Sequence, residues 1–230
     1  MKRFIQFATV LILATSAAVA APVVCPNSAF SIAVGTAYTG AITCDGLVFS
    51  NFAVTNSTGN SVGRFDVNSI SFDTASSMVV LSGNPNLGAG GHIDLFYTVT
   101  GGVQQLDLSM GGVSGSVQER ACAVPIPTTG INANLCVNSG GTIVAPLGQV
   151  NLSSGQLPQP VFSMTFPVTS PIYVFKDIAA GPSGGLSTIN QSFHTGGNEG
   201  NFGNEVPEPA TFGFMGAGLI AFAVYRRKSA

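Results

Sequence analysis

The chain contains only two histidines, His92 and His194, and few groups that could act with them in catalysis. His92 and Asp94 lie two residues apart, so on a β-strand they would share a face and could meet as a pair. We interpret the pair as a loop-edge histidine beside a surface carboxylate. The sequence has no His-Glu-x-x-His helix and no phosphate-binding glycine loop that ends in Lys. No catalytic residue is therefore assigned.

The segment from Asn84 to Asp94 is rich in glycine and asparagine and could wrap a calcium ion. Ca²⁺ takes roughly six to eight oxygen ligands, which backbone carbonyls and the Asp94 carboxylate could supply in part. A single carboxylate is a weak basis for such a site. We therefore interpret the segment as a flexible hairpin loop and expect neither a metal ion nor a cofactor.

The sequence contains few features that would indicate carbohydrate or ice binding. Aromatic platforms for sugars usually include Trp, which this chain lacks, although Tyr38, Tyr97 and Tyr173 could serve. An ice-binding face would need a regular Thr-x-Thr ladder, and only Thr98-Val99-Thr100 has that spacing. Paired carboxylates for sugar hydrolysis would have to come from scattered acidic residues, and no spacing favours them.

Charge excludes one class of partner. Between residues 21 and 205 three basic residues stand against nine acidic ones, which gives a net charge of −6. Binding to nucleic acid requires clustered Lys and Arg, so no nucleic-acid partner is expected. The polar residues are instead Gly, Ser, Thr and Asn, a composition typical of secreted β-proteins.

The four cysteines agree with export, because disulfides persist in oxidising compartments. Pairing between sequence neighbours would join Cys25 to Cys44 and Cys122 to Cys136, but four cysteines allow three connectivities and the sequence does not choose among them. Zinc binding is the weaker interpretation, because no histidine lies near a cysteine at ligand spacing.

Short runs of alternating apolar residues, separated by Gly, Asn, Ser and Pro, predict an antiparallel sheet. We expect residues 21–194 to form an all-β antiparallel sandwich, jelly-roll-like in size. The expected strands are Leu47–Val54, Arg64–Phe72, Met78–Leu81, Ile93–Val99, Gln105–Met110, Val113–Glu119, Phe162–Phe166, Ile172–Asp177 and Leu186–Phe193.

Two local features are also predicted. Apolar parity switches between Phe49 and Phe52, so a β-bulge is expected near Ser50-Asn51. Gly101-Gly102 has the form of a two-residue hairpin turn, which would make the strand after it the partner of the strand before it.

The N-terminus is typical of a signal peptide. Lys2 and Arg3 precede an apolar run from Phe4 to Ala14, and small residues follow it. We expect signal peptidase to cut after Ala20, with Ala18 and Ala20 in the recognised positions and Ala21 as the first mature residue. Residues 1–20 are then a leader.

The C-terminus shows three elements in a fixed order. After a Gly- and Asn-rich stretch at 195–205, which we expect to be a flexible linker, come Val206, Pro207, Glu208 and Pro209. The uncharged residues 210–225 follow and would form a transmembrane helix roughly 24 Å long. A cluster of Arg226, Arg227 and Lys228 would then stay cytoplasmic and stop the chain.

These elements resemble the PEP-CTERM sorting signal, which is also called the ice-binding protein C-terminal domain. The resemblance covers about the last 25 residues and implies no ice binding by the rest of the chain. It implies that the chain is a substrate of an exosortase in a Gram-negative bacterium that makes extracellular polysaccharide. Residues 206–209 would be the recognised motif, and the inner membrane would hold the chain before processing. The alternative is a plain membrane anchor.

We therefore expect an exported, non-enzymatic protein of the cell surface or extracellular matrix, associated with exopolysaccharide. One alternative is a carbohydrate-binding module or weak glycan-active enzyme on the same scaffold. Another is a self-associating adhesin.

Overall fold

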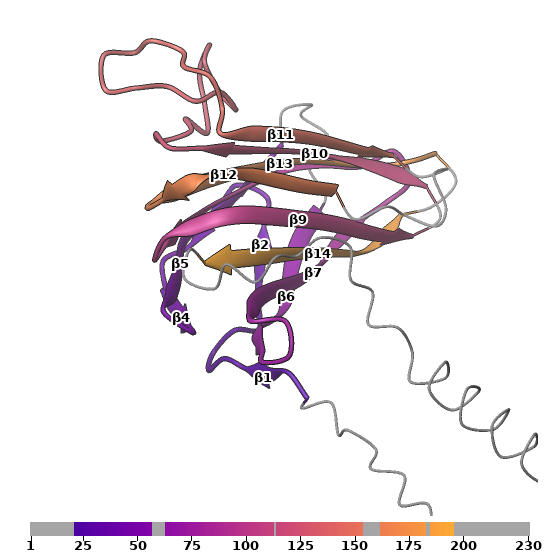
Figure 1. Cartoon of the computed structure of the whole chain (residues 1–230). Coiled ribbons are helices and arrows are strands. Elements are labelled where there is room, and N and C mark those ends of the chain that lie inside the picture. The colour runs from indigo at the N-terminus through magenta and orange to yellow at the C-terminus, as the bar shows by residue number, and fades with distance from the viewer. Residues whose placement is uncertain (1–20, 57–62, 113, 154–161, 183–184, 196–230) are drawn as a thin grey trace, which may run out of the picture. The chain divides into compact units, whose positions relative to one another are not determined.

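The computed structural model describes residues 21–56, 63–112, 114–153, 162–182 and 185–195. Within these ranges the chain forms fourteen β-strands and no helix, which confirms the all-β prediction (Figure 1). The strands are β1 (Val23–Val24), β2 (Phe30–Ala33), β3 (Thr36–Tyr38), β4 (Ile42–Cys44), β5 (Leu47–Thr55), β6 (Gly63–Asp73), β7 (Met78–Leu87), β8 (His92–Thr100), β9 (Val103–Gly112), β10 (Gly115–Cys122), β11 (Gly148–Ser153), β12 (Phe162–Thr169), β13 (Ile172–Ala180) and β14 (Leu186–Thr195).

The predicted leader at 1–20 and the sorting tail at 206–228 lie outside the described residues, as does the linker after Thr195. In the part of the chain that is described, no helix has the length and apolar character needed to cross a membrane.

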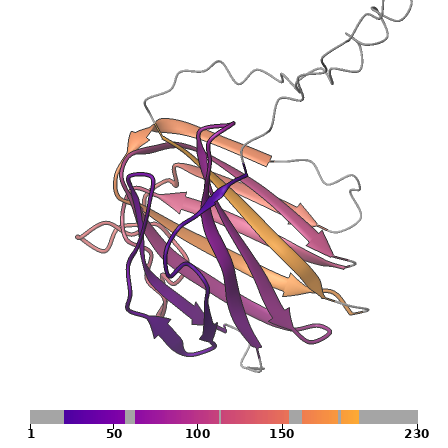
Figure 2. The same cartoon turned by 90° about the horizontal axis from the view of Figure 1, so that it is seen from below.

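The strands form two antiparallel sheets of seven strands each. Sheet A has the order β1-β6-β7-β14-β9-β12, with β2 also paired to β6. Sheet B has the order β11-β10-β13-β8-β5-β3, with β4 also paired to β5. The two sheets pack face to face as a sandwich (Figures 1 and 2).

The bulge predicted in β5 is confirmed. The pairing of β5 with β8 shifts register between Ser50 and Ala53, and Asn51 adopts a positive φ of 55°. Asn tolerates this left-handed conformation better than most residues. The extra residue lets Phe49 and Phe52 both reach the core, where each is fully buried.

The predicted hairpin at Gly101-Gly102 is wrong, although the turn itself is present. β8 belongs to sheet B and pairs with β5 and β13, whereas β9 belongs to sheet A and pairs with β12 and β14. The two glycines, with φ of 131° and 81°, carry the chain from one sheet to the other. A Cβ on Gly101 would lie 2.5 Å from the carbonyl oxygen of Gly46, so the corner leaves no room for a side chain.

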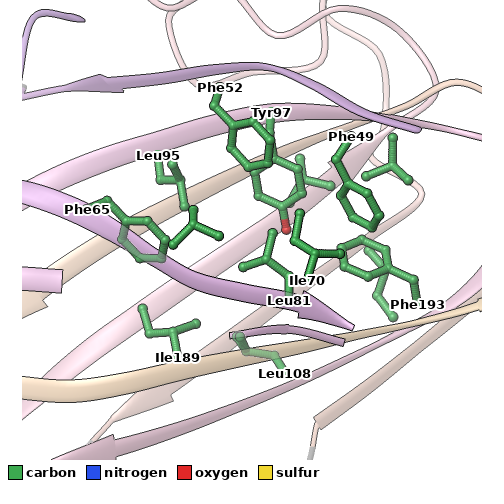
Figure 3. Close-up of a cluster of buried hydrophobic side chains, with 14 of the residues drawn as sticks. Phe49, Phe52, Phe65, Ile70, Leu81, Leu95, Tyr97, Leu108, Ile189 and Phe193 are labelled. Carbon is green, nitrogen blue, oxygen red and sulfur yellow. The ribbon is translucent and has the colours of Figure 1, made fainter. Parts of the chain in front are cut away.

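Aromatic side chains from both sheets meet between the layers (Figure 3). Phe52 and Tyr97 of sheet B stack with ring centroids 5.2 Å apart. Phe49 of sheet B meets the ring of Phe193 of sheet A edge to face at 5.0 Å. Such pairs add about 0.5–1.5 kcal/mol beyond the area they bury. The core therefore ties the two sheets into one layered unit.

Both disulfides join cysteines that are neighbours in the sequence. Cys25 bonds to Cys44, and Cys122 bonds to Cys136, with Cα atoms 5.5 and 5.6 Å apart. Of the three connectivities that the sequence allows, the structure contains this one. The first bond ties the segment after β1 to β4, and the second ties the end of β10 to the long loop that follows it.

Candidate functional site: the outer face of sheet B

Alternate residues of sheet B point away from the core and form its outer face, of which the central part, with Phe96 and Phe175, is covered. On β13 the outward residues are Tyr173, Phe175 and Asp177, because Val174, Lys176 and their even-numbered neighbours face inward. Their partners in register on the adjacent strands are Thr98, Phe96 and Asp94 of β8, and Cys122, Arg120 and Gln118 of β10.

The loop between β10 and β11, residues 123–147, folds back on part of this surface. The Cys122–Cys136 disulfide anchors it, and the Arg120 guanidinium donates a hydrogen bond to the carbonyl oxygen of Asn134. Within the loop, Val137 pairs with Ile143 in an isolated antiparallel bridge. The loop is thus a fixed wall over one end of the outer face (Figure 1).

Under that wall lies a hollow of about 210 Å³. Tyr173 and Thr98 contribute to its floor, and Pro125, Ile126 and Thr128 of the loop form its side. It combines an aromatic ring, hydroxyl groups and aliphatic surface. A hollow of this composition suits a ligand with both apolar and hydroxylated faces.

A second hollow of about 310 Å³ lies further along the same face, over β10 and β11. Its lining is mostly hydrogen-bonding and uncharged, with one carboxylate: the residues are Ser116, Val117, Gln118, Asn151, Leu152, Ser153 and Asp177. These side chains carry both donors and acceptors, the pattern that binds sugar hydroxyls.

Residues of strand β13 line both hollows. Tyr173 lines one and Asp177 the other, and four residues of strand span about 13 Å. Between them Phe175 packs on Phe96 with centroids 5.2 Å apart.

The Arg120 guanidinium lies 6.0 Å from the Phe175 ring and donates to Gln149 Oε1 at 3.1 and 3.2 Å. Burial lowers the pKa of Arg120, but a guanidinium remains charged at neutral pH.

His92 and Asp94 share the outer face of β8, with His92 Nε2 and Asp94 Oδ1 4.0 Å apart. The expectation of a surface carboxylate is wrong, because Asp94 is only 2% exposed. Asp177, which the sequence did not place here, lies 2.5 Å from His92 Nε2. Donor atoms of the three residues lie within 4.8 Å of one another. The direct His92–Asp177 contact is closer than two ligands of one metal ion, so we interpret the group as a hydrogen-bonded network.

The hairpin loop predicted for residues 84–94 is wrong in its extent, and the strands on either side of it lie in different sheets. Residues 84–87 belong to β7 and pair with β6, so only residues 88–91 form the connection to β8. Asn84 pairs with Asp66, and its backbone is therefore committed to the sheet. Residues 84–87, whose carbonyls a calcium loop would have used, are therefore extended along a strand.

Of the three tyrosines considered for a sugar platform, Tyr173 and Tyr97 line the smaller hollow, but only Tyr173 occupies an outward position of its strand. Tyr97 is 2% exposed in the core, and Tyr38 stacks on Phe30 with centroids 4.0 Å apart. Thr98 is 8% exposed and Thr100 lies at the end of its strand, so the pair presents no flat ladder.

A second polar cluster lies inside the sandwich, and no motif in the sequence indicates it. Lys176, Glu119 and Gln191 are each 0% exposed. Lys176 Nζ donates hydrogen bonds to the carboxylate of Glu119 and to the side-chain oxygen of Gln191. Each residue occupies an inward position of its strand, where apolar residues are expected. A polar residue in the apolar register of a predicted strand was therefore the one sequence feature that could have indicated the cluster.

Gly59–Gly63 reads Gly-Asn-Ser-Val-Gly, the spacing of a hydrolase nucleophile elbow. That motif requires a sharp turn from a strand into a helix. Gly63 instead begins β6, and the preceding strand is β5. Residues 57–62 lie outside the described residues, but the element that follows the pattern is a strand and not the helix that an elbow requires.

The described residues thus form a disulfide-bonded antiparallel β-sandwich, and the outer face of its sheet B carries two hollows. The family described as PEP-CTERM protein-sorting motif matches residues 205–228. The chain therefore carries a PEP-CTERM sorting tail, as its resemblance predicted, and this motif implies export and recognition by an exosortase. Searches of curated proteins and of solved structures found no match.

Proposed function

We propose that this chain is an exported, exosortase-processed protein of the cell surface or extracellular matrix, and that its sandwich binds exopolysaccharide without catalysing a reaction. The match of the PEP-CTERM motif to residues 205–228 carries the first part of this proposal. The two disulfides support it, since such bonds persist outside the cytoplasm.

The order of the tail gives a physical route for sorting. In this proposal, Pro207 and Pro209 would keep the motif extended and prevent a helix from propagating back into it. The apolar residues 210–225 then hold the chain in the inner membrane, and the basic residues 226–228 keep the end inside. An exosortase would recognise the motif at the outer surface and release the sandwich.

Replacing Pro207, Glu208 and Pro209 together with Ala tests the sorting step. The variant should stay in the inner-membrane fraction at its unprocessed length, whereas the parent chain should leave that fraction. A matched control replaces Asn198, Glu199 and Asn201, which precede the matched residues 205–228, with Ala, and should leave sorting unchanged. Equal release of the motif variant and the parent would contradict exosortase sorting.

The strand order supports a jelly-roll assignment for the sandwich. From β7 to β14 the strands divide into β7-β14-β9-β12 in sheet A and β8-β13-β10-β11 in sheet B. This interleaving of two Greek keys is the jelly-roll arrangement, which lectin domains also use. Fold alone assigns no ligand, so the binding role rests on the outer face of sheet B.

Three properties of that face support a glycan ligand. Its larger hollow is lined mainly by neutral hydrogen-bonding side chains, its smaller hollow contains Tyr173, and β13 places the two about 13 Å apart. A chain-like ligand with repeated hydroxyl groups would contact both. The Cys122–Cys136 bond holds the loop wall in place before binding, which reduces the entropic cost of binding.

Affinity electrophoresis of the full chain in gels containing the producing strain's exopolysaccharide tests this role. Asn151→Ala should weaken retardation about tenfold, because it removes an exposed amide from the larger hollow. Asn190→Ala makes the same change on the outer face of sheet A and should have no effect. Equal retardation of the two variants would contradict the assigned face.

The same preparations separate the two alternatives. Release of sugars from the polysaccharide that is lost in His92→Asn would indicate a glycan-active enzyme instead. Assembly that rises with protein concentration in the absence of glycan would indicate a self-associating adhesin.

A further inference from the structure

The buried cluster of Lys176, Glu119 and Gln191 joins the two sheets. Glu119 on β10 lies directly opposite Lys176 on β13, both in sheet B. Gln191 lies on β14 in sheet A and meets the Lys176 side chain across the interior. All three side chains are fully buried.

The surroundings of the cluster exclude water. Leu95 is the neighbour of Lys176 on β8, and Leu81 and Leu108 flank Gln191 on β7 and β9. Each of these leucines is 0% exposed. An ammonium in such a setting is costly even when paired, and a well-packed apolar residue would often be at least as stable. Stability alone therefore gives no reason for a lysine here.

The setting favours the uncharged forms of the two ionisable groups. Burial lowers the pKa of the Lys176 amine, against the opposing charge of Glu119. Burial raises the pKa of the Glu119 carboxyl, against interactions with Lys176 and the Gln191 side chain. A neutral amine is a nucleophile, and a protonated carboxyl can deliver a proton to an amide.

Hydrogen bonding in the cluster is incomplete. Glu119 Oε1, Gln191 Nε2 and the hydroxyl of nearby Tyr97 are buried without a partner that meets hydrogen-bond geometry. Figure 3 shows the Tyr97 hydroxyl directed into hydrocarbon side chains of the core. Buried polar groups without partners are costly. Loss of the Gln191 amide nitrogen would remove one of them.

We propose that Lys176 and Gln191 form an intramolecular isopeptide bond, with Glu119 as the proton-transferring catalytic residue. Lys176 Nζ adds its lone pair to Gln191 Cδ, the carbon bonded to the oxygen that Nζ already contacts. Glu119 takes a proton from Nζ and gives one to the departing Nε2. The new Nζ–Cδ bond replaces the Cδ–Nε2 bond, and ammonia leaves. No oxidant, reductant or other reactant is required.

The bond would join β13 of sheet B to β14 of sheet A through the interior. Unlike the two disulfides, an amide cannot be opened by a thiol reductant. Its position in the core also shields it from proteases. The sandwich would then hold three covalent links, one of them independent of redox conditions, which suits a protein exposed outside the cell.

Accurate intact-mass measurement of the reduced, full-length chain tests this proposal. The observed mass should be lower by one ammonia than the mass calculated for the residues that the chain retains, and a digest should contain the Lys176 and Gln191 peptides joined. Glu119→Gln keeps the side-chain size but removes the acid, and Lys176→Met removes the nucleophile. Both variants should have the full calculated mass, and Gln118→Asn, on the outer face of β10, should retain the loss.

Folding of each variant is checked by its intact disulfides and by cooperative thermal unfolding. A folded parent chain with the full calculated mass would overturn the proposal. A loss of one water instead of one ammonia would also overturn it, because Glu119 would then be the residue bonded to Lys176. Neither result depends on glycan binding or on sorting.

Discussion

Asp107 is a residue whose ionisation the fold favours. It lies on the outer face of β9, 2.5 Å from His194 Nε2 and 2.9 Å from Gln105 Nε2. Burial acts to raise the pKa of its carboxyl, but hydrogen bonds from His194, Ser163 and Gln105 outweigh burial and lower it below 3.8. The folded state therefore favours the ionised carboxylate more than the unfolded chain does.

This depressed pKa fixes the sign of a pH effect. Stability from Asp107 is fully present above 3.8, the ordinary pKa, and is lost as the pH falls through the lower folded value. Asp107→Asn should reduce the free energy of unfolding at pH 7 by about 1–2 kcal/mol, because it removes hydrogen bonds to a charged acceptor. It should also flatten the loss of stability on the acid side.

Chemical denaturation of the parent chain and of Asp107→Asn measures this effect. A range from about pH 2.5 to about pH 7 covers the acid-side loss of stability. Asp45→Asn, in an exposed turn, is the control and should change stability by less than about 0.5 kcal/mol. Parallel pH curves for the parent chain and Asp107→Asn would contradict the assigned role of Asp107.

Among the elements, the corner between β8 and β9 leaves little freedom to the backbone. Gly101 has a φ of 131°, and a Cβ there would meet backbone atoms of Gly46 and Leu47 at 2.5 and 3.1 Å. Backbone cannot yield as a flexible side chain can. The corner therefore fixes how β8 leaves sheet B and enters sheet A as β9.

Gly101→Ala should accordingly lower the free energy of unfolding by about 2–3 kcal/mol, since it adds both backbone strain and a collision. Gly88→Ala is the matched control, because a Cβ at Gly88 meets nothing within 4 Å. That control should change stability by less than about 1 kcal/mol. Thermal or urea unfolding of the three chains is the measurement, and equal loss in both variants would contradict the corner argument.

At the scale of the whole molecule, alternation of apolar residues predicted the long strands well. The strands predicted at Ile172–Asp177 and Leu186–Phe193 begin at the predicted residues and end three and two residues later. The strand predicted at Met78–Leu81 continues six residues further, to Leu87. The short strands β1 to β4 were not predicted, since two to four residues carry too little alternation to detect. The sequence also could not predict which strands pair, because two consecutive glycines are compatible both with a hairpin turn and with a corner between two sheets.

The candidate site was less predictable than the fold. The outer face of sheet B draws residues from strands that are distant in sequence, and its loop wall depends on which cysteines pair. The interior cluster could have been suspected at Lys176, a cation at the inward parity of β13. The partners of Lys176 could not have been predicted, because the order of the strands and the packing of the two sheets bring Glu119 and Gln191 to it.

The most direct test of the account is to determine both ends of the protein recovered from outside the cells. Terminal-peptide mass spectrometry of the extracellular fraction should find Ala21 at the beginning and no peptide containing residues 226–228. In cells that lack exosortase activity, those residues should remain attached and the chain should stay with the membrane. An extracellular chain that still carries Arg226, Arg227 and Lys228 would contradict the proposal.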